Sequence, residues 1–138
     1  MQGDRLRVQL DNGYAETIGR AVFVFSRLEW DAIWTCEKLS PGYINNLGTK
    51  TAGLIANDLI RLTSALPSAA DFAPHCAEFK SLVDIRNRLL HGKPGSAPNG
   101  DQNLFDNGVA WTIEKIDEAA DRFTACQIAL NPLMHALP

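Results

Sequence analysis

The stretch YAETIGRAVFVFSRLEWDAIWTCEKL, residues 14–39, decides the fold because it is long, amphipathic and free of proline. Its apolar residues recur at the three- to four-residue spacing of an α-helix, at Ile18, Val22, Phe25, Leu28, Ala32 and Cys36. The side expected to be buried is widened by a second apolar row, Phe23, Trp30, Ile33 and Trp34. The stretch therefore predicts one long helix that packs on two sides or lies at a subunit interface. Ser40-Pro41-Gly42 ends it.

Three more segments have helical periodicity. One runs from residue 49 or 50 to residue 64, and its expected buried residues are Leu54, Leu59 and Leu62. The next ends before Gly92 and Pro94, because a glycine just past the last periodic residue, followed by a proline, marks a helix C-terminus. The last covers residues 112–131, with Thr112 as its N-cap. Four helices with short connections predict an all-α fold, an antiparallel up-and-down four-helix bundle.

Signals for β-structure are weak. Residues 5–10 alternate apolar and polar side chains, which suits a short strand or an extended arm. Residues 92–103, GKPGSAPNGDQN, are rich in glycine, proline and polar residues and predict an exposed loop without a packed element. Asn107-Gly108 between two apolar pairs predicts a small hairpin before the last helix.

Composition describes one soluble domain over residues 1–138, with 46% apolar and 21% charged residues. Thirteen Lys and Arg against sixteen Asp and Glu give a formal charge of −3, which argues against a general polyanion binder. Any contact with nucleic acid must be local. The longest apolar run, residues 21–25, is far below the ~20 residues of a bilayer crossing, and the start of the chain lacks a signal-peptide pattern. We therefore expect no membrane insertion.

The three cysteines are an odd number, lie far apart and form no metal-ligand spacing. We interpret them as buried thiols in a reducing cytoplasm. Motifs for dinucleotides, nucleoside triphosphates, zinc hydrolysis and serine nucleophiles are also absent, so no cofactor or metal is expected. The cysteines are Cys36, Cys76 and Cys126.

One segment, DIRNRLLHGK at residues 84–93, combines residue types that can carry chemistry. Arg86 continues the apolar stripe of its helix, so its charged head is aimed toward a packed surface. There it must meet an anion, a carboxylate or a subunit boundary, since an unpaired buried charge is costly. His91 lies about 140° around an ideal helix from Arg86. The two converge only if the last turn loosens, which Gly92 permits, or if a second copy supplies the partner.

Arg86, Asn87 and His91, in the pattern Arg-polar-x3-His at a helix end, resemble the motif of the HEPN superfamily of helical bundles. This resemblance implies a metal-independent endoribonuclease of toxin–antitoxin or phage-defence type, with these three residues in the active site. It also implies a homodimer and a small nucleotidyltransferase-type antitoxin as partner. The specific residues that match are confined to the segment from Arg86 to Gly92.

RNA cleavage by the 2′-hydroxyl needs a base, an acid and a cation for the phosphorane. His91 suits the acid or base and Arg86 the cation, and a twofold dimer with the third helices face to face would supply a second histidine. Substrate contacts are expected from a local cationic strip, Lys80, Arg88 and Lys93 beside Arg86.

Structural interpretations of the same residues remain open. Arg86 could pair with a buried carboxylate such as Glu29, and His91 could cap its helix. The motif could then belong to a non-catalytic module that binds a nucleotide or a protein partner. Trp30, Trp34 and Trp111 could be stacking platforms for bases. The helical spacing of Trp30 and Trp34 also suits a core or a dimer interface.

Overall fold

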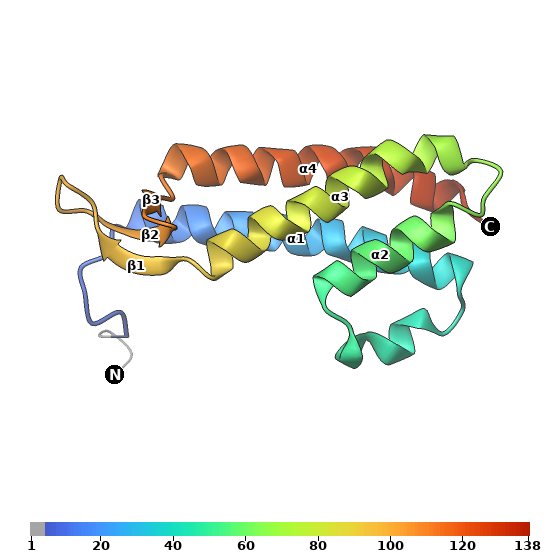
Figure 1. The fold of residues 1–138 in the computed structure, drawn as a ribbon, viewed down its shortest axis with the longest axis horizontal. Helices are drawn as coiled ribbons and strands as arrows, with labels where there is room; N and C mark the ends of the chain where they lie inside the picture. The colour runs from blue at the N-terminus through green and yellow to red at the C-terminus, as the bar shows by residue number, and fades with distance from the viewer. Residues whose placement is uncertain (1–4) are drawn as a thin grey trace.

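The computed structural model describes residues 5–138, which are mostly helical with a small three-stranded sheet (Figure 1). In chain order, the elements are α1 (Asn12–Leu39), the 3-10 helix η2 (Tyr43–Thr49), α2 (Ala52–Thr63), α3 (Ala69–Leu90), β1 (Lys93–Ser96), β2 (Gln102–Asp106), β3 (Val109–Ala110) and α4 (Ile113–Ala136). Of the two alternatives for residues 5–10, a short strand or an extended arm, the strand is not formed, since residues 5–8 form bends. This segment lacks a neighbouring strand to hold an extended conformation. No helix within residues 5–138 is long and apolar enough to cross a membrane.

The helix starts are specified by side-chain caps. The Asp11 carboxylate accepts the backbone N–H of Tyr14 at the start of α1, at 3.0 Å. The Thr112 hydroxyl accepts the backbone N–H of Lys115 at 3.1 Å, which confirms Thr112 as the N-cap of α4. Each cap satisfies one N–H that has no partner within the helix.

α1 and α4 lie side by side and run in the same direction. Near the start of both helices, the Tyr14 hydroxyl donates to the Trp111 carbonyl at 2.6 Å. At their ends, the Lys38 amine donates to the carbonyls of Met134 and Leu137 at 3.0 and 3.1 Å. Only α3 points the other way among the long helices (Figure 1). The expected strict alternation of helix direction is therefore wrong, because η2 carries the chain back before α2 starts.

The core lies between α1, α3 and α4. Phe25 of α1 lies at its centre, with ring centroids 6.1 Å from Phe79 of α3 and 5.1 Å from Phe123 of α4. Leu28, Ala32 and Cys36 of the predicted apolar row are also buried. On α2, Leu59 is buried as expected, but Leu54 is half exposed because Ile55 and Ala56 take the inward positions instead. All three cysteines are buried and free of disulfides, as predicted.

The second apolar row of α1 is mostly not buried. Of its four residues, only Ile33 lies in the core. Phe23 is 67% exposed, Trp30 48% and Trp34 39%. The neighbouring helices cover the opposite side of α1, so these aromatic side chains face outward.

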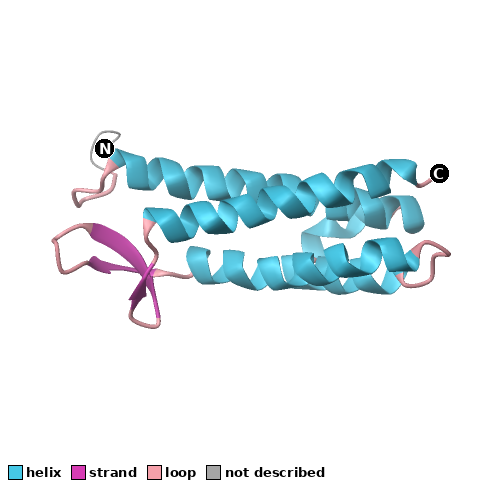
Figure 2. Ribbon diagram, turned by 90° about the horizontal axis from the view of Figure 1, so that it is seen from above, coloured by secondary structure: helices cyan, strands magenta, loops and turns pink. Residues whose placement is uncertain are grey.

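The strands form an antiparallel sheet in the order β1-β2-β3, at the end of the molecule where α3 finishes and α4 begins (Figure 2). The hairpin at Asn107-Gly108 is confirmed, with φ of 49° and 79° at its two turn residues. The prediction that residues 92–103 contain no packed element is wrong. Residues 93–96 form β1, which pairs with β2 through backbone groups that the side-chain pattern does not reveal.

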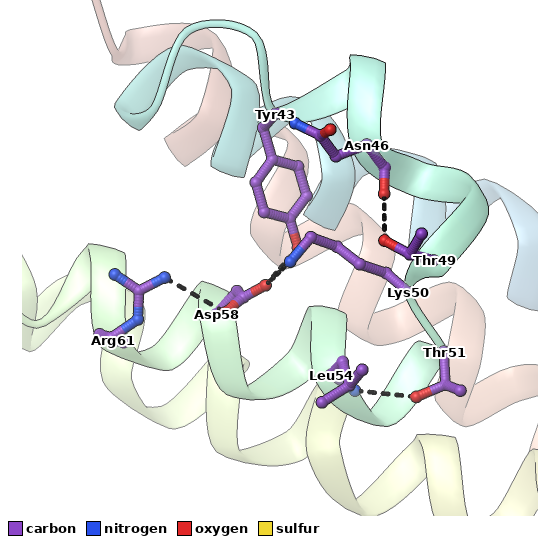
Figure 3. Close-up of polar contacts among 8 residues, drawn as sticks. All are labelled: Tyr43, Asn46, Thr49, Lys50, Thr51, Leu54, Asp58 and Arg61. Atoms are coloured by element: carbon purple, nitrogen blue, oxygen red, sulfur yellow. Dashed lines mark hydrogen bonds and ion pairs between the residues drawn. The ribbon is translucent and has the colours of Figure 1, made fainter.

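Asp58 holds η2 and its C-terminal link against α2 (Figure 3). Its Oδ2 atom accepts the Tyr43 hydroxyl and the Lys50 amine, both at 2.8 Å, and its Oδ1 accepts Arg61 at 3.2 Å. The hydrogen bond from Lys50, followed by those from Tyr43 and Arg61, lowers the pKa of Asp58 to about 2 against the opposing effect of burial. The Asp58 carboxylate therefore links η2, through Tyr43, and the residue that follows it, Lys50, to α2.

Candidate functional site at the end of α3

The motif residues occupy the last turn of α3 and the residue after it. Arg86 and Asn87 lie within the helix, and His91 is its C-cap with φ −92° and ψ 6°. The His91 N–H donates to the Asn87 carbonyl at 2.9 Å, and the Gly92 N–H donates to the Leu89 carbonyl at 3.1 Å. The last turn thus tightens toward 3-10 spacing, so the loosening that Gly92 would permit does not occur.

Arg86 points at α1 of its own chain. Its guanidinium carbon lies 4.6 Å from the centroid of the Phe25 ring, and one terminal nitrogen lies 3.9 Å from the Glu29 carboxylate. The two charged side chains are 22% and 27% exposed. The carboxylate partner that the sequence left open for Arg86 is therefore present. Arg86 is thus largely engaged within its own chain.

The contact between Arg86 and Glu29 is loose. A distance of 3.9 Å is an ion pair but exceeds the usual length of an N–H···O hydrogen bond. The Nε atom of Arg86 is buried and has no hydrogen-bond partner among the described residues. Burial raises the pKa of the Glu29 carboxyl, and the charge of Arg86 opposes that rise. The guanidinium is thus held by charge and by the aromatic ring, with hydrogen-bonding capacity left for an anion.

His91 is exposed to solvent at the boundary between α3 and the sheet. Within residues 5–138, no hydrogen bond or ion pair joins its ring to Arg86. Gly92 fixes the position of this boundary. A Cβ atom there would lie 3.0 Å from the Cβ of Leu104 in β2 and 3.1 Å from the Leu89 carbonyl oxygen. Any larger residue would require Leu104 or the helix end to shift by a few tenths of an ångström.

The other cationic residues do not gather beside Arg86. At 100° per residue, Lys80 and Arg88 lie about 120° and 160° around α3 from Arg86. Arg88 pairs with Asp84 at 3.3 Å and lines a surface pocket of about 350 Å³ between α3, the sheet and α4. Lys80 and Lys93 are exposed. The basic residues therefore surround the helix, and the single cationic strip expected from the sequence is not formed.

One contributor to this region was missed in the sequence, and a second, Trp111, was named as a possible stacking residue without a position. Phe25 was expected only as a core residue, although it lies one helical turn before Glu29 and both therefore share the side of α1 that meets Arg86. Trp111 lines the pocket beside Arg88, and its indole N–H is buried without a partner in the described chain. Nothing in the local pattern around Trp111 indicates that position.

Other residues do not assemble into a second reactive site. In the part of the chain that the structure describes, no three His, Cys, Asp or Glu side chains gather as ligands for a metal ion. Burial raises the pKa of Cys36 and Cys126 to about 12 and also raises that of Cys76, so none of these thiols is activated as a nucleophile.

Comparisons of the chain with protein-family models, curated proteins and solved structures find no match. The likeness to HEPN proteins therefore depends on the Arg86–His91 motif and on the end of the helix that carries it.

Proposed function

We propose that the protein is a HEPN-like four-helix domain that cleaves RNA without a metal ion and leaves 2′,3′-cyclic phosphate ends. The observation that supports this proposal is that α3 carries both an exposed His91 at its end and an Arg86 whose guanidinium keeps unused hydrogen-bonding capacity. In this role the protein is a toxin or phage-defence factor, and a nucleotidyltransferase-type antitoxin is its partner.

The reaction is an internal transfer at phosphorus. The 2′-oxygen forms a bond to phosphorus while the bond to the 5′-oxygen breaks, which gives a cyclic phosphate and a 5′-hydroxyl. One imidazole takes the proton of the 2′-hydroxyl, and an acid gives a proton to the leaving oxygen. Arg86 stabilises the charge of the phosphorane, and Asn87 orients the phosphate.

A second copy of the chain completes this chemistry, because a single histidine cannot act as base and acid at once. The Arg86 side chain remains 22% exposed, and the substrate would contact this exposed part. A phosphate can displace the 3.9 Å contact with Glu29, since it offers the guanidinium two oxygens in bidentate geometry.

The direct test is to incubate the purified protein, free of any antitoxin, with RNA in EDTA and to analyse the product ends. We expect cleavage with cyclic phosphate ends, and a loss of about 10²- to 10⁴-fold in rate for His91→Ala. His135→Ala is the matched control, because His135 is equally exposed but lies at the far end of α4. RNA that stays intact would refute the activity, and a fully active His91→Ala protein would refute the site.

A second candidate function is a non-catalytic module that binds a nucleotide or a protein partner. It is favoured by the separation of Arg86 and His91 within one chain and by the Glu29 contact that already occupies Arg86. Thermal shift with mononucleotides separates the two functions. Stabilisation by a nucleotide without RNA cleavage, weakened by Arg86→Ala, would support binding alone.

A further inference from the structure

Glu29 and Arg86 are opposite charges that lie together without using their hydrogen-bonding groups. One terminal nitrogen of Arg86 lies 3.9 Å from the Glu29 carboxylate, beyond the usual length of a hydrogen bond. Within residues 5–138, the guanidinium donates no hydrogen bond and the carboxylate accepts none. A guanidinium and a carboxylate can form several such bonds each, so both side chains keep capacity for a third group.

The surroundings of the pair strengthen the effect of its charges. The Phe25 ring lies against the guanidinium, with 4.6 Å between its centroid and the guanidinium carbon. An apolar ring screens charge less than water does, so each charge acts strongly on its neighbours. Both charged side chains nevertheless remain partly exposed. A phosphate can therefore reach Arg86 and offer it two oxygens, which Glu29 at its present distance does not.

A phosphate on Arg86 would lie beside the Glu29 carboxylate. Two negative charges held close together repel, and one of the groups then takes up a proton. A phosphodiester stays ionised near neutral pH, so the proton goes to the carboxylate. Burial already raises the pKa of Glu29, and the charge of Arg86 opposes this rise. A bound phosphate would offset the charge of Arg86 and so remove that opposition.

We propose that Glu29 is a positioning residue that holds Arg86 in the free protein and takes up a proton when an RNA phosphodiester binds to Arg86. This inference rests on the proposed function, since it concerns the same arginine and the same phosphate. The proton comes from the solvent and forms an O–H bond on one carboxylate oxygen. The neutral carboxyl can then donate a hydrogen bond to the phosphate, while the guanidinium is released to donate its own.

The role falls to Glu29 because of what faces it. Among the described residues, Arg86 of α3 is the only charged group that shifts the pKa of Glu29, although α2 and α4 also pack against α1. The nearest other acid on α1, Asp31, is directed to α4, where its Oδ2 accepts Gln127 at 2.8 Å and Asn131 at 3.0 Å. Glu29 is thus the carboxylate that responds to a change at Arg86.

Affinity for the phosphodiester should fall as the pH rises. The pKa of Glu29 is higher in the complex than in the free protein, because attraction by Arg86 is replaced by repulsion from the phosphate. Between these two pKa values, binding takes up protons and the affinity declines with pH. Below this window Glu29 is neutral in both states, and above it Glu29 is ionised in both, so the affinity is constant there.

The test is isothermal titration calorimetry with a 2′-O-methylated RNA trinucleotide. Its blocked 2′-oxygen cannot attack phosphorus, so binding is measured without cleavage. Titrations between about pH 5 and pH 9, repeated in buffers of different ionisation enthalpy, give the affinity and the number of protons taken up. We expect the wild type to lose about tenfold in affinity across the window and to take up about half a proton at its midpoint, as for a pKa shift of about one unit.

Glu29→Gln imitates the neutral carboxyl. It should bind the trinucleotide about tenfold more tightly than the wild type at the high end of the window, and equally tightly at the low end. Glu16→Gln is the matched control, because it removes one carboxylate from the same helix, but Glu16 is exposed and pairs with Arg20. This control should keep the pH dependence of the wild type. Circular dichroism establishes that each variant is folded.

His91 is a second group that can titrate beside a bound RNA. The same proteins are therefore compared again with His91→Gln added to each. The proton uptake that Glu29→Gln removes should persist in the protein that carries His91→Gln alone. This measurement leaves Glu29 in place, so it tests the inference even if Glu29→Gln does not fold.

Binding without proton uptake in the His91→Gln protein would overturn the inference. A Glu29→Gln protein with the affinity and pH dependence of the wild type would overturn it as well, as would a trinucleotide that does not bind. The ribonuclease would survive any of these results if unmodified RNA is still cleaved. Proton-linked binding to a protein that leaves unmodified RNA intact would support the role of Glu29 while it refutes the ribonuclease.

Discussion

Asp58 gives the sharpest test of the energetics of this fold. Its carboxylate accepts hydrogen bonds from Tyr43, Lys50 and Arg61, and these lower its pKa from 3.8 to about 2. A shift of this size corresponds to about 2 kcal/mol of stability. Asp58→Asn keeps the shape and one acceptor oxygen, but it removes the charge and replaces the other oxygen with an NH2 donor. We therefore expect a loss of about 1–2 kcal/mol at pH 7, or roughly 3–6 °C in Tm.

The pH dependence has a definite sign. Because the folded pKa of Asp58 lies below the unfolded one, its contribution is complete above pH 3.8 and is lost as the pH falls toward 2. Urea titrations of wild type and Asp58→Asn should differ by the full amount at pH 7 and by about a third of it at pH 2.5. A difference that stays constant over this range would refute the electrostatic explanation.

Asp84→Asn provides the control for that experiment. Asp84 forms an ion pair with Arg88 one helical turn away, but both side chains are more than half exposed. Solvent screening should reduce its effect to under about 0.5 kcal/mol. An equal loss for both variants would show that the cluster around Asp58 has no special role.

Three further outcomes follow from the core and the sheet. Phe79→Ala should lower the free energy of unfolding by about 3–5 kcal/mol in urea titration, because the ring is fully buried; a loss below 1 kcal/mol would contradict its central position. Tyr14→Phe removes a hydroxyl that accepts the Leu104 N–H at 2.9 Å, so hydrogen exchange at Leu104 should accelerate, and unchanged protection would contradict this. The buried thiols of Cys36, Cys76 and Cys126 should resist a thiol reagent at pH 8 in the folded protein and react in urea. Rapid labelling of the folded protein would show that at least one thiol is accessible.

The helices could be predicted because their periodicity is local. The apolar row of α1, the Thr112 cap and the end of α3 near Gly92 all follow from residues within a few positions of each other. Helix direction could not be predicted, because an apolar face packs equally well against a parallel or an antiparallel neighbour. The parallel arrangement of α1 and α4 depends on the path of η2, whose sequence has no periodic signal.

β1 escaped prediction for a related reason. Its residues Lys93–Ser96 are polar or small, and the strand is held by backbone pairing with β2.

The candidate site was predicted in part. Glu29 was predicted as a possible partner of Arg86. The contact between the Phe25 ring and the guanidinium was not predicted, because a phenylalanine that packs in the core and one that contacts a cation occupy the same apolar position of a helix.

The tight approach of β2 to Gly92 ties the end of α3 to the hairpin. His91 is followed at once by a residue where an added Cβ would lie 3.0 Å from the Cβ of Leu104 and 3.1 Å from the Leu89 carbonyl oxygen. A larger residue at position 92 would therefore push the sheet and the helix end apart by a few tenths of an ångström.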